Sequence, residues 1–316
     1  MPGRLFIDTG RFRRNMRGNM RAKTTLGYAM LAVIVIIWGA TFVSTKVLLR
    51  HLDPVDILVD RFLIGYLALW VIHPRREKFT TLKNELLMFA AGICAVVLYF
   101  LCENLALART QASNVVLLVS TTPVLTMLLS AWLNRDTAIT RGTVAGCLAG
   151  LAGAVLVFLN GGMMPGINSL GDCLALLAAL SWAFYCVLIK RISGIGSAIA
   201  LTRRIFGYGL LGMIPVVCVT GLHARVGTWG ELARPGVIGN MLFLGLGASA
   251  LCYVLWNSAV KIVGVARAAN WLYFVPVVTL AMAAVVLGEK ITGFAIAGTV
   301  LIMGGVYVAD RSGRGR

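Results

Sequence analysis

One acidic residue of this chain lies inside an apolar stretch, a position that is unfavourable unless the carboxylate has a chemical role. Glu103 lies among apolar residues, and Tyr99 precedes it by four positions. Residues four apart share one face of a helix, so the phenol and the carboxylate would point the same way. An ionised carboxylate at such a place in a bilayer costs about 2.5–3.5 kcal/mol. Glu103 is therefore predicted to bind a ligand's ammonium group or to carry a proton; the alternative is a structural ion pair with Arg109 or Lys46.

Aromatic and amide side chains in other apolar stretches could complete a site for a small molecule. Tyr253 and Asn257 repeat the four-residue spacing, and Trp38 and Trp182 occupy matching positions in two further stretches. An apolar cavity with a few convergent polar groups suits a small organic ligand, and an aromatic ring also attracts a cation. The alternative is that these rings lie in the aromatic belts at the membrane surfaces. The residues predicted to bind the ligand are Trp38, Thr41, Phe42, Tyr99, Glu103, Asn104, Asn114, Trp182, Tyr185, Tyr253, Asn257 and Asn270.

Two of these residues, Asn114 and Asn270, lie near the starts of apolar stretches that also contain a proline. A helix start offers unpaired backbone N–H groups and the positive end of the helix dipole, which together could bind a carboxylate. Pro123 and Pro276 each remove a backbone hydrogen bond and would kink their helix. They are predicted to act as hinges, and the alternative is that they serve packing alone.

The composition is that of a protein embedded in a membrane. Of the 316 residues, 59% are hydrophobic and 13% are charged, and the mean hydropathy is +0.86. Charged residues are too few to cover a soluble protein of this size. The formal net charge of +17 resides mainly in tails and short loops, so it predicts membrane orientation and not nucleic-acid binding.

Metal, redox and enzymatic chemistry have little support in the sequence. The seven cysteines form no CxxC pair, and only three histidines occur. No metal site and no cofactor are therefore expected. The chain also lacks the phosphate-binding, nucleophile-elbow and zinc-protease motifs. No catalytic residue is predicted, and any transport must draw on a gradient of substrate or protons.

Ten apolar segments follow one another, each near the roughly 20 residues that a spanning helix needs. Their predicted ranges are 27–49, 56–73, 84–107, 113–133, 140–160, 170–190, 199–220, 236–259, 267–287 and 292–310. Residues 1–26 form a basic arm without a convincing cleavage site, and residues 311–316 form a basic tail. If the arm is cytoplasmic, 22 of the 29 Lys and Arg residues fall on that side. The positive-inside rule then places both termini in the cytoplasm.

The sequence contains an internal repeat. Adding 144 to a position aligns Trp38 with Trp182 and Lys46 with Lys190. Adding 153 pairs identical residues further on, namely Asn104 with Asn257, Ala106 with Ala259, Pro123 with Pro276, Val124 with Val277, Thr126 with Thr279 and Ala131 with Ala284. Segments 1–5 therefore match segments 6–10, and because five is odd the second copy is predicted to be inverted. Such inverted repeats are typical of transporters, whose substrate site lies where the repeats meet.

At this level of detail the chain resembles the drug/metabolite transporter superfamily, in its ten-helix form built from two EamA repeats. The motifs that carry the resemblance are Trp38-Gly39 with Lys46, Glu103-Asn104-Leu105-Ala106 leading into Ala112-Ser113, Pro123, Pro276, Leu287-Gly288-Glu289 and the Gly-rich last helix of each half. The resemblance implies an all-α integral membrane protein with two inverted five-helix repeats, 27–161 and 168–310, around a central cavity. It also implies transport by alternating access, with helices 5 and 10 as scaffold.

Similar proteins export amino acids and other small metabolites, so the resemblance implies an exporter in the bacterial inner membrane. An importer of a nucleoside-, vitamin- or phosphate-bearing metabolite is the alternative within transport. An importer of anions should line its cavity with Lys or Arg, and Lys46, Arg61, Lys190 and Arg204 are near enough to helix ends to extend to water instead. A membrane scaffold or lipid-handling protein without transport is the alternative outside it. Proton coupling stays open. The glycines of 140–160 favour packing within one chain, so a monomer or a weak homodimer is expected.

Overall fold

The computed structural model describes residues 9–75, 78–110, 112–134, 140–159, 169–220, 230, 233–287 and 293–312, and these residues form helices and turns without a strand. The helices are α1 (Thr9–Leu48), α2 (Pro54–Ile72), α3 (Leu82–Gly92), η1 (Ile93–Leu98), α4 (Tyr99–Arg109), α5 (Ala112–Val119), α6 (Thr122–Asn134), α7 (Arg141–Leu159), α8 (Ser169–Ile192), α9 (Ala198–Thr220), α11 (Pro235–Leu242), η2 (Phe243–Leu251), α12 (Cys252–Val263), α13 (Val265–Trp271), η3 (Leu272–Phe274), α14 (Val275–Leu287) and α15 (Gly293–Ser312).

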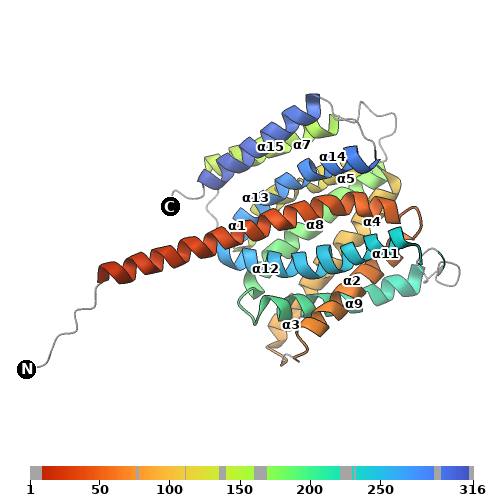
Figure 1. Ribbon diagram of the computed structural model, residues 1–316, viewed down its shortest axis with the longest axis horizontal. Helices are drawn as coiled ribbons and strands as arrows, with labels where there is room; N and C mark the ends of the chain where they lie inside the picture. The colour runs from red at the N-terminus through yellow and green to blue at the C-terminus, as the bar shows by residue number, and fades with distance from the viewer. Residues whose placement is uncertain are drawn as a thin grey trace, which may run out of the picture.

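Six continuous helical stretches of the described residues are long and apolar enough to cross a membrane. They are Ala22–Leu48, Leu82–Arg109, Leu170–Ile192, Ala198–Thr220, Pro235–Val263 and Val265–Val286. Helix α2 has a similar length but carries Asp56, Asp60 and Arg61, which lower its hydropathy. Helix α1 begins at Thr9, well before the predicted start of the first apolar segment, and its first part extends beyond the bundle (Figure 1).

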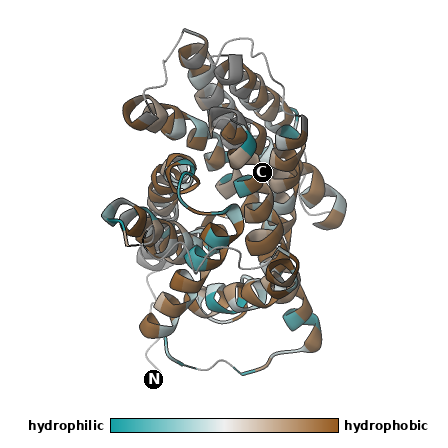
Figure 2. Ribbon diagram, turned by 90° about the vertical axis from the view of Figure 1, so that its right-hand side faces the viewer, coloured by the Kyte–Doolittle hydropathy of each residue, from teal (hydrophilic) through white to brown (hydrophobic). Residues whose placement is uncertain are grey.

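Hydrophobic side chains cover the outside of the bundle as well as its inside. Figure 2 shows hydrophobic residues on the outward faces of most helices. Val71 and Val285 are 83% and 84% exposed, and Trp132 is 72% exposed. A soluble monomer rarely leaves so much apolar surface in water. The surface therefore fits a protein surrounded by lipid.

Two of the predicted helices contain a π-helical segment in their middle. η1 separates α3 from α4 and η2 separates α11 from α12, and both interrupt stretches that were expected to be continuous α-helix. Ala95 in η1 and Ala248 in η2 are again 153 positions apart. The carbonyl oxygen of Ala95 accepts a 2.8 Å hydrogen bond from Tyr253, and that of Ala248 accepts a 3.0 Å bond from Trp38. Each π segment is thus held by an aromatic side chain from the other half of the chain.

Two other predicted helices, 113–133 and 267–287, are each broken before their proline. Pro123 is the second residue of α6, and Pro276 is the second residue of α14. Proline has no N–H to donate, so it is tolerated in the first turn of a helix and ends the hydrogen bonding of the turn before it. The breaks at 120–121 and 272–274 are therefore local consequences of these two residues.

The packing of the helices repeats between the two halves of the chain. Helix α1 packs against α12 and α14, and its counterpart α8 packs against α4 and α6. Helix α2 packs against η2, and α9 packs against η1. Helices α7 and α15 pack against each other beside the bundle (Figure 1). A Cβ added at Gly305 would lie 2.6 Å from the Gly146 carbonyl oxygen, so the small residues of these two helices allow a close contact within one chain.

Candidate functional site

A cavity lies between the two halves, with walls from α1, α2, α4, α5, α8 and the two proline breaks. It holds about 520 Å³ of space that no atom fills, part of it open to solvent. Its lining residues are Trp38, Thr41, Phe42, Arg61, Tyr99, Phe100, Glu103, Val116, Val119, Ser120, Thr122, Trp182, Leu272 and Val275. Six of the twelve predicted ligand-binding residues are among them: Trp38, Thr41, Phe42, Tyr99, Glu103 and Trp182.

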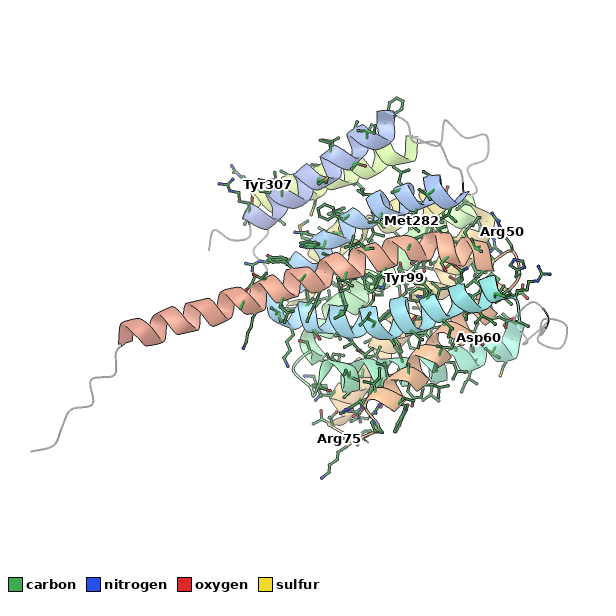
Figure 3. All side chains as sticks on the ribbon, viewed as in Figure 1. Arg50, Asp60, Arg75, Tyr99, Met282 and Tyr307 are labelled. Atoms are coloured by element: carbon green, nitrogen blue, oxygen red, sulfur yellow. The ribbon has the colours of Figure 1, made fainter. Side chains whose placement is uncertain are left out.

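Aromatic rings form one continuous wall of this cavity. The Trp38 and Trp182 rings meet edge to face with centroids 5.1 Å apart, and Tyr99 lies 5.0 Å from Trp182 and 4.6 Å from Phe100. Such pairs add about 0.5–1.5 kcal/mol each beyond the area they bury. Tyr99 occupies the middle of the bundle (Figure 3). The wall is therefore a rigid apolar surface, suited to an aliphatic or aromatic group of a ligand.

Glu103 lies in this cavity and is 3% exposed. Tyr99 donates a hydrogen bond to its Oε1 atom over 3.5 Å, at the limit of such a contact. Lys46, the first cation considered as its structural partner, donates through Nζ to the carbonyl oxygens of Leu107 and Thr110 at 2.6 and 2.9 Å. Within the described residues no ion pair joins Glu103 to Lys46 or Arg109. Its contacts leave the carboxylate available to a ligand.

Arg61 is a cavity residue that the sequence analysis treated only as an orienting charge or as a mark of an anion importer. It is 1% exposed, and its Nε atom donates to Ser249 Oγ over 3.1 Å. Its guanidinium lies over the Phe100 ring, 4.1 Å from the centroid. The Nη1 atom has no hydrogen-bond partner. An arginine two turns inside an apolar helix was the available signal, and the assumption that its side chain would extend to the membrane surface concealed it.

Three of the remaining predicted residues take part in hydrogen bonds away from the cavity lining. Tyr185 donates to Asn257 Oδ1 at 2.7 Å, and Asn257 Nδ2 lies 2.8 Å from Thr202 Oγ1. Tyr253 donates to the carbonyl oxygen of Ala95 in η1. All of these side chains are buried. They form a polar layer between the cavity and the ends of the helices that carry the predicted cytoplasmic loops, and their role in ligand binding stays a prediction.

Two of the other amide residues, Asn104 and Asn270, are not brought to this cavity. Asn104 Nδ2 donates to the Pro54 carbonyl oxygen at 3.0 Å, and Asn104 Oδ1 has no partner. Asn270 is 8% exposed and lies outside the lining. The side chain of Asn114 falls outside the described residues. Residues that the sequence missed, such as Ser120, Thr122 and Leu272, reach the cavity because the helices break before Pro123 and Pro276.

A group of polar contacts joins the two halves at the opposite end of the bundle. Glu85 of α3 is buried and accepts hydrogen bonds from Thr80, from Arg204 and, at 2.6 Å, from Tyr208. Arg203 donates to carbonyl oxygens in the loop after α2 and stacks over the Trp70 ring, 4.2 Å from its centroid. Helix α9 of the second half is thereby fastened to α2 and α3 of the first.

An all-helical bundle with a lipid-facing surface and a buried site of mixed charge defines a multi-pass membrane protein of the transporter class. The chain belongs to the EamA-like transporter family, whose model matches it twice, over residues 25–159 and 169–309. The family is one of transporters.

Individual relatives cover nearly the full chain. An "Uncharacterized transporter" of Archaeoglobus fulgidus is 28% identical over 294 residues, which are 92% of this chain and 98% of the relative. A "Probable amino-acid metabolite efflux pump" of Salmonella typhimurium is 28% identical over 284 residues, covering 87% and 92%. A crystal structure titled "Crystal structure of protein" superposes with a TM-score of 0.71 over 93% of this chain and 98% of that chain, at 20% identity. The last similarity shows a shared fold.

Proposed function

We propose that this protein is a secondary active transporter that exports amino acids or similar small metabolites across the inner membrane. The observation that carries the proposal is a buried carboxylate, Glu103, in a cavity walled by aromatic rings at the meeting place of the two halves. A carboxylate next to aromatic faces suits an ammonium group with an apolar substituent. The name of the Salmonella relative, an amino-acid metabolite efflux pump, points in the same direction.

The proposed architecture is ten spanning helices in two inverted repeats, 27–161 and 168–310, with both termini in the cytoplasm. The double match of the family model supports the duplication. The exchange of helix contacts between the halves supports a two-fold relation, as do the paired bonds to Ala95 and Ala248. The distribution of Lys and Arg supports the orientation.

Alternating access is supported by where the cavity lies. Its residues come from the second half of α1, the second turn of α2 and the first half of α4, which is the last part of the continuous stretch Leu82–Arg109. The other end is closed by the Glu85 and Arg203 contacts. With the N-terminus in the cytoplasm, this arrangement is closed to the cytoplasm, and transport requires those contacts to break while the breaks at Pro123 and Pro276 flex as hinges.

Uptake of an anionic metabolite is the second candidate, because Arg61 brings a positive charge into the same cavity. Glu103 opposes it, since a carboxylate repels an anion in a low-dielectric site. Coupling to protons is part of the proposal: protonation of Glu103 would release an ammonium group and allow exchange of a proton for the substrate.

The test is a ligand screen and then a flux measurement. Detergent-purified protein is heated with amino acids, organic cations, nucleosides, sugars or phosphorylated metabolites, because a ligand at 100 times its Kd stabilises by about 2.7 kcal/mol. Efflux of the hits from preloaded proteoliposomes is then measured, with and without a pH gradient. The variants are Glu103→Gln and, as a control, Asp53→Asn, an exposed carboxylate whose side chain caps no helix.

We expect amino acids to stabilise the protein and to be transported, and Glu103→Gln to abolish both effects while Asp53→Asn leaves them intact. A pH gradient should accelerate efflux if protons are exchanged. If phosphorylated metabolites alone are bound and Glu103→Gln is without effect, the export proposal is wrong. If the protein inserts normally into proteoliposomes but transports none of these compounds, its assignment as a transporter is in question.

A further inference from the structure

The cavity contains one buried cation and one buried anion that are not paired with each other. Arg61 comes from α2 and Glu103 from α4, and both line the cavity. They are 1% and 3% exposed, and no ion pair joins them in the part of the chain that the structure describes. Buried charges in proteins are normally paired, because the loss of water around them is expensive. Arg61 and Glu103 attract each other electrostatically but share no hydrogen bond, so a ligand group that bonds to each of them would satisfy both charges.

Arg61 also has an unused hydrogen-bond donor. Its Nε is fixed by Ser249 Oγ and its plane by the Phe100 ring, while Nη1 has no partner. A buried donor without an acceptor is unfavourable, and more so when it is charged. The planar guanidinium is suited to a carboxylate, whose two oxygens match its parallel N–H groups. The fixed orientation means that little further ordering is needed when such a group binds.

The hydroxyls of the lining already donate to the backbone. Those of Thr41, Ser120 and Thr122 each donate to a carbonyl oxygen three or four residues earlier in the chain, at 2.6 Å. Arg61 and Glu103 are thus the charged side chains of the lining with capacity left for a ligand, together with the weakly held Tyr99 hydroxyl and the Trp182 Nε1 donor, which has no partner. The remaining walls are apolar or aromatic.

We propose that Arg61 binds the carboxylate and Glu103 the ammonium group of a zwitterionic amino acid whose side chain is apolar or aromatic. The proposal rests on the transport function proposed above and narrows its substrate class. A simple anion would meet Glu103, and a simple cation would meet Arg61, whereas a zwitterion satisfies both. An acidic or basic side chain would bury one more charge without a partner against the Trp38 and Trp182 rings, which is unfavourable.

The experiment compares ligands that differ by one charge. The probes are L-leucine, L-phenylalanine, phenylalaninamide, N-acetylphenylalanine, phenethylamine and 3-phenylpropionate, and their Kd values are measured by equilibrium binding to the full-length chain in detergent. Loss of one partner from a buried charged pair weakens binding by about 100-fold. We therefore expect wild-type protein to prefer phenylalanine about 100-fold over each probe that lacks a charge.

The variants assign each charge to its residue. Arg61→Gln should reduce the preference for phenylalanine over phenylalaninamide to near unity, and Arg61→Lys should restore part of it. Glu103→Gln should do the same for the preference over N-acetylphenylalanine. Arg50→Gln is the control, since Arg50 is exposed at the end of the bundle (Figure 3). Each variant changes one ratio and leaves the other, which a general loss of structure would not do.

The outcomes separate this proposal from the one on which it rests. If amino acids are transported but wild-type protein binds the amide as tightly as the acid, the role of Arg61 is refuted and export stands. The same holds if Arg61→Gln keeps the full preference. If no amino acid binds while a phosphorylated compound does so through Arg61, both proposals fall. If Arg61→Gln does not fold, the ligand ratios of the wild-type protein still decide the question.

Discussion

The buried hydrogen bonds of Tyr185, Asn257 and Thr202 permit a quantitative test of what holds the second half together. Tyr185 and Thr202 are 0% exposed and Asn257 is 2% exposed. Tyr185→Phe removes the 2.7 Å donor to Asn257 Oδ1 and leaves that oxygen buried without a partner. The cost of such an oxygen is about 1–3 kcal/mol. Asn257→Ala removes two hydrogen bonds and leaves a small void, so it should cost somewhat more.

Combining Tyr185→Phe with Asn257→Ala tests whether the two side chains interact. In the Asn257→Ala background the Tyr185 hydroxyl has already lost its acceptor, so Tyr185→Phe should then cost almost nothing. We expect a coupling free energy of about 1–2 kcal/mol between the two substitutions. Thermal unfolding of the four proteins in one detergent measures it, with each kcal/mol worth about 2–4 °C in Tm. Costs that add to within about 0.5 kcal/mol would show that the two side chains do not interact and would refute the hydrogen bond.

Two further predictions concern contacts between the halves. Gly305→Ala should lower the free energy of unfolding by about 1–3 kcal/mol, because the added Cβ would lie 2.6 Å from a carbonyl oxygen of α7. The control is Gly304→Ala, which should be neutral because nothing lies within 4 Å of the added Cβ. Equal Tm values for the two variants would contradict the close contact. Tyr208→Phe removes a 2.6 Å hydrogen bond to Glu85 and should favour opening at that end by up to about tenfold. Opening can be measured by the rate at which maleimide labels a cysteine placed at the buried position Ala200, in a chain without its native cysteines. An unchanged labelling rate in Tyr208→Phe would refute the prediction.

The sequence was sufficient for the class of protein and for one face of the site. Hydropathy alone predicts helices in lipid, and the four-residue spacing correctly placed Tyr99 and Glu103 together in the cavity. The repeat marked Trp38 and Trp182 as equivalent residues, and the structure brings their two rings together. Those expectations depended on local periodicity and on the duplication, both of which one sequence displays.

Other parts of the site could not be predicted, for three physical reasons. The Arg61 side chain is long enough to extend to the membrane surface as well as into the cavity, and only tertiary packing shows it held beside Phe100 and Ser249. Ser120 and Leu272 entered the cavity through helix breaks whose geometry a proline suggests but does not fix. The π segments left no mark, since a stretch that is apolar on all sides has no periodicity to distinguish a π turn from an α turn.

The π segments η1 and η2 determine how far the helices that follow them, α4 and α12, are rotated about their own axes. Successive residues of an α-helix are about 100° apart around the axis, and a π turn holds one more residue than an α turn. If the residues of η1 were wound as regular α-helix, Tyr99 and Glu103 would therefore turn about 100° away from the cavity. Regular α-helix in place of η2 would likewise rotate Tyr253 and Asn257 off their partners. The hydrogen bonds to the carbonyl oxygens of Ala95 and Ala248 therefore hold η1 and η2 from the opposite half of the chain. In this way each half fixes the rotation of a helix in the other half, and with it the direction in which the side chains of that helix point.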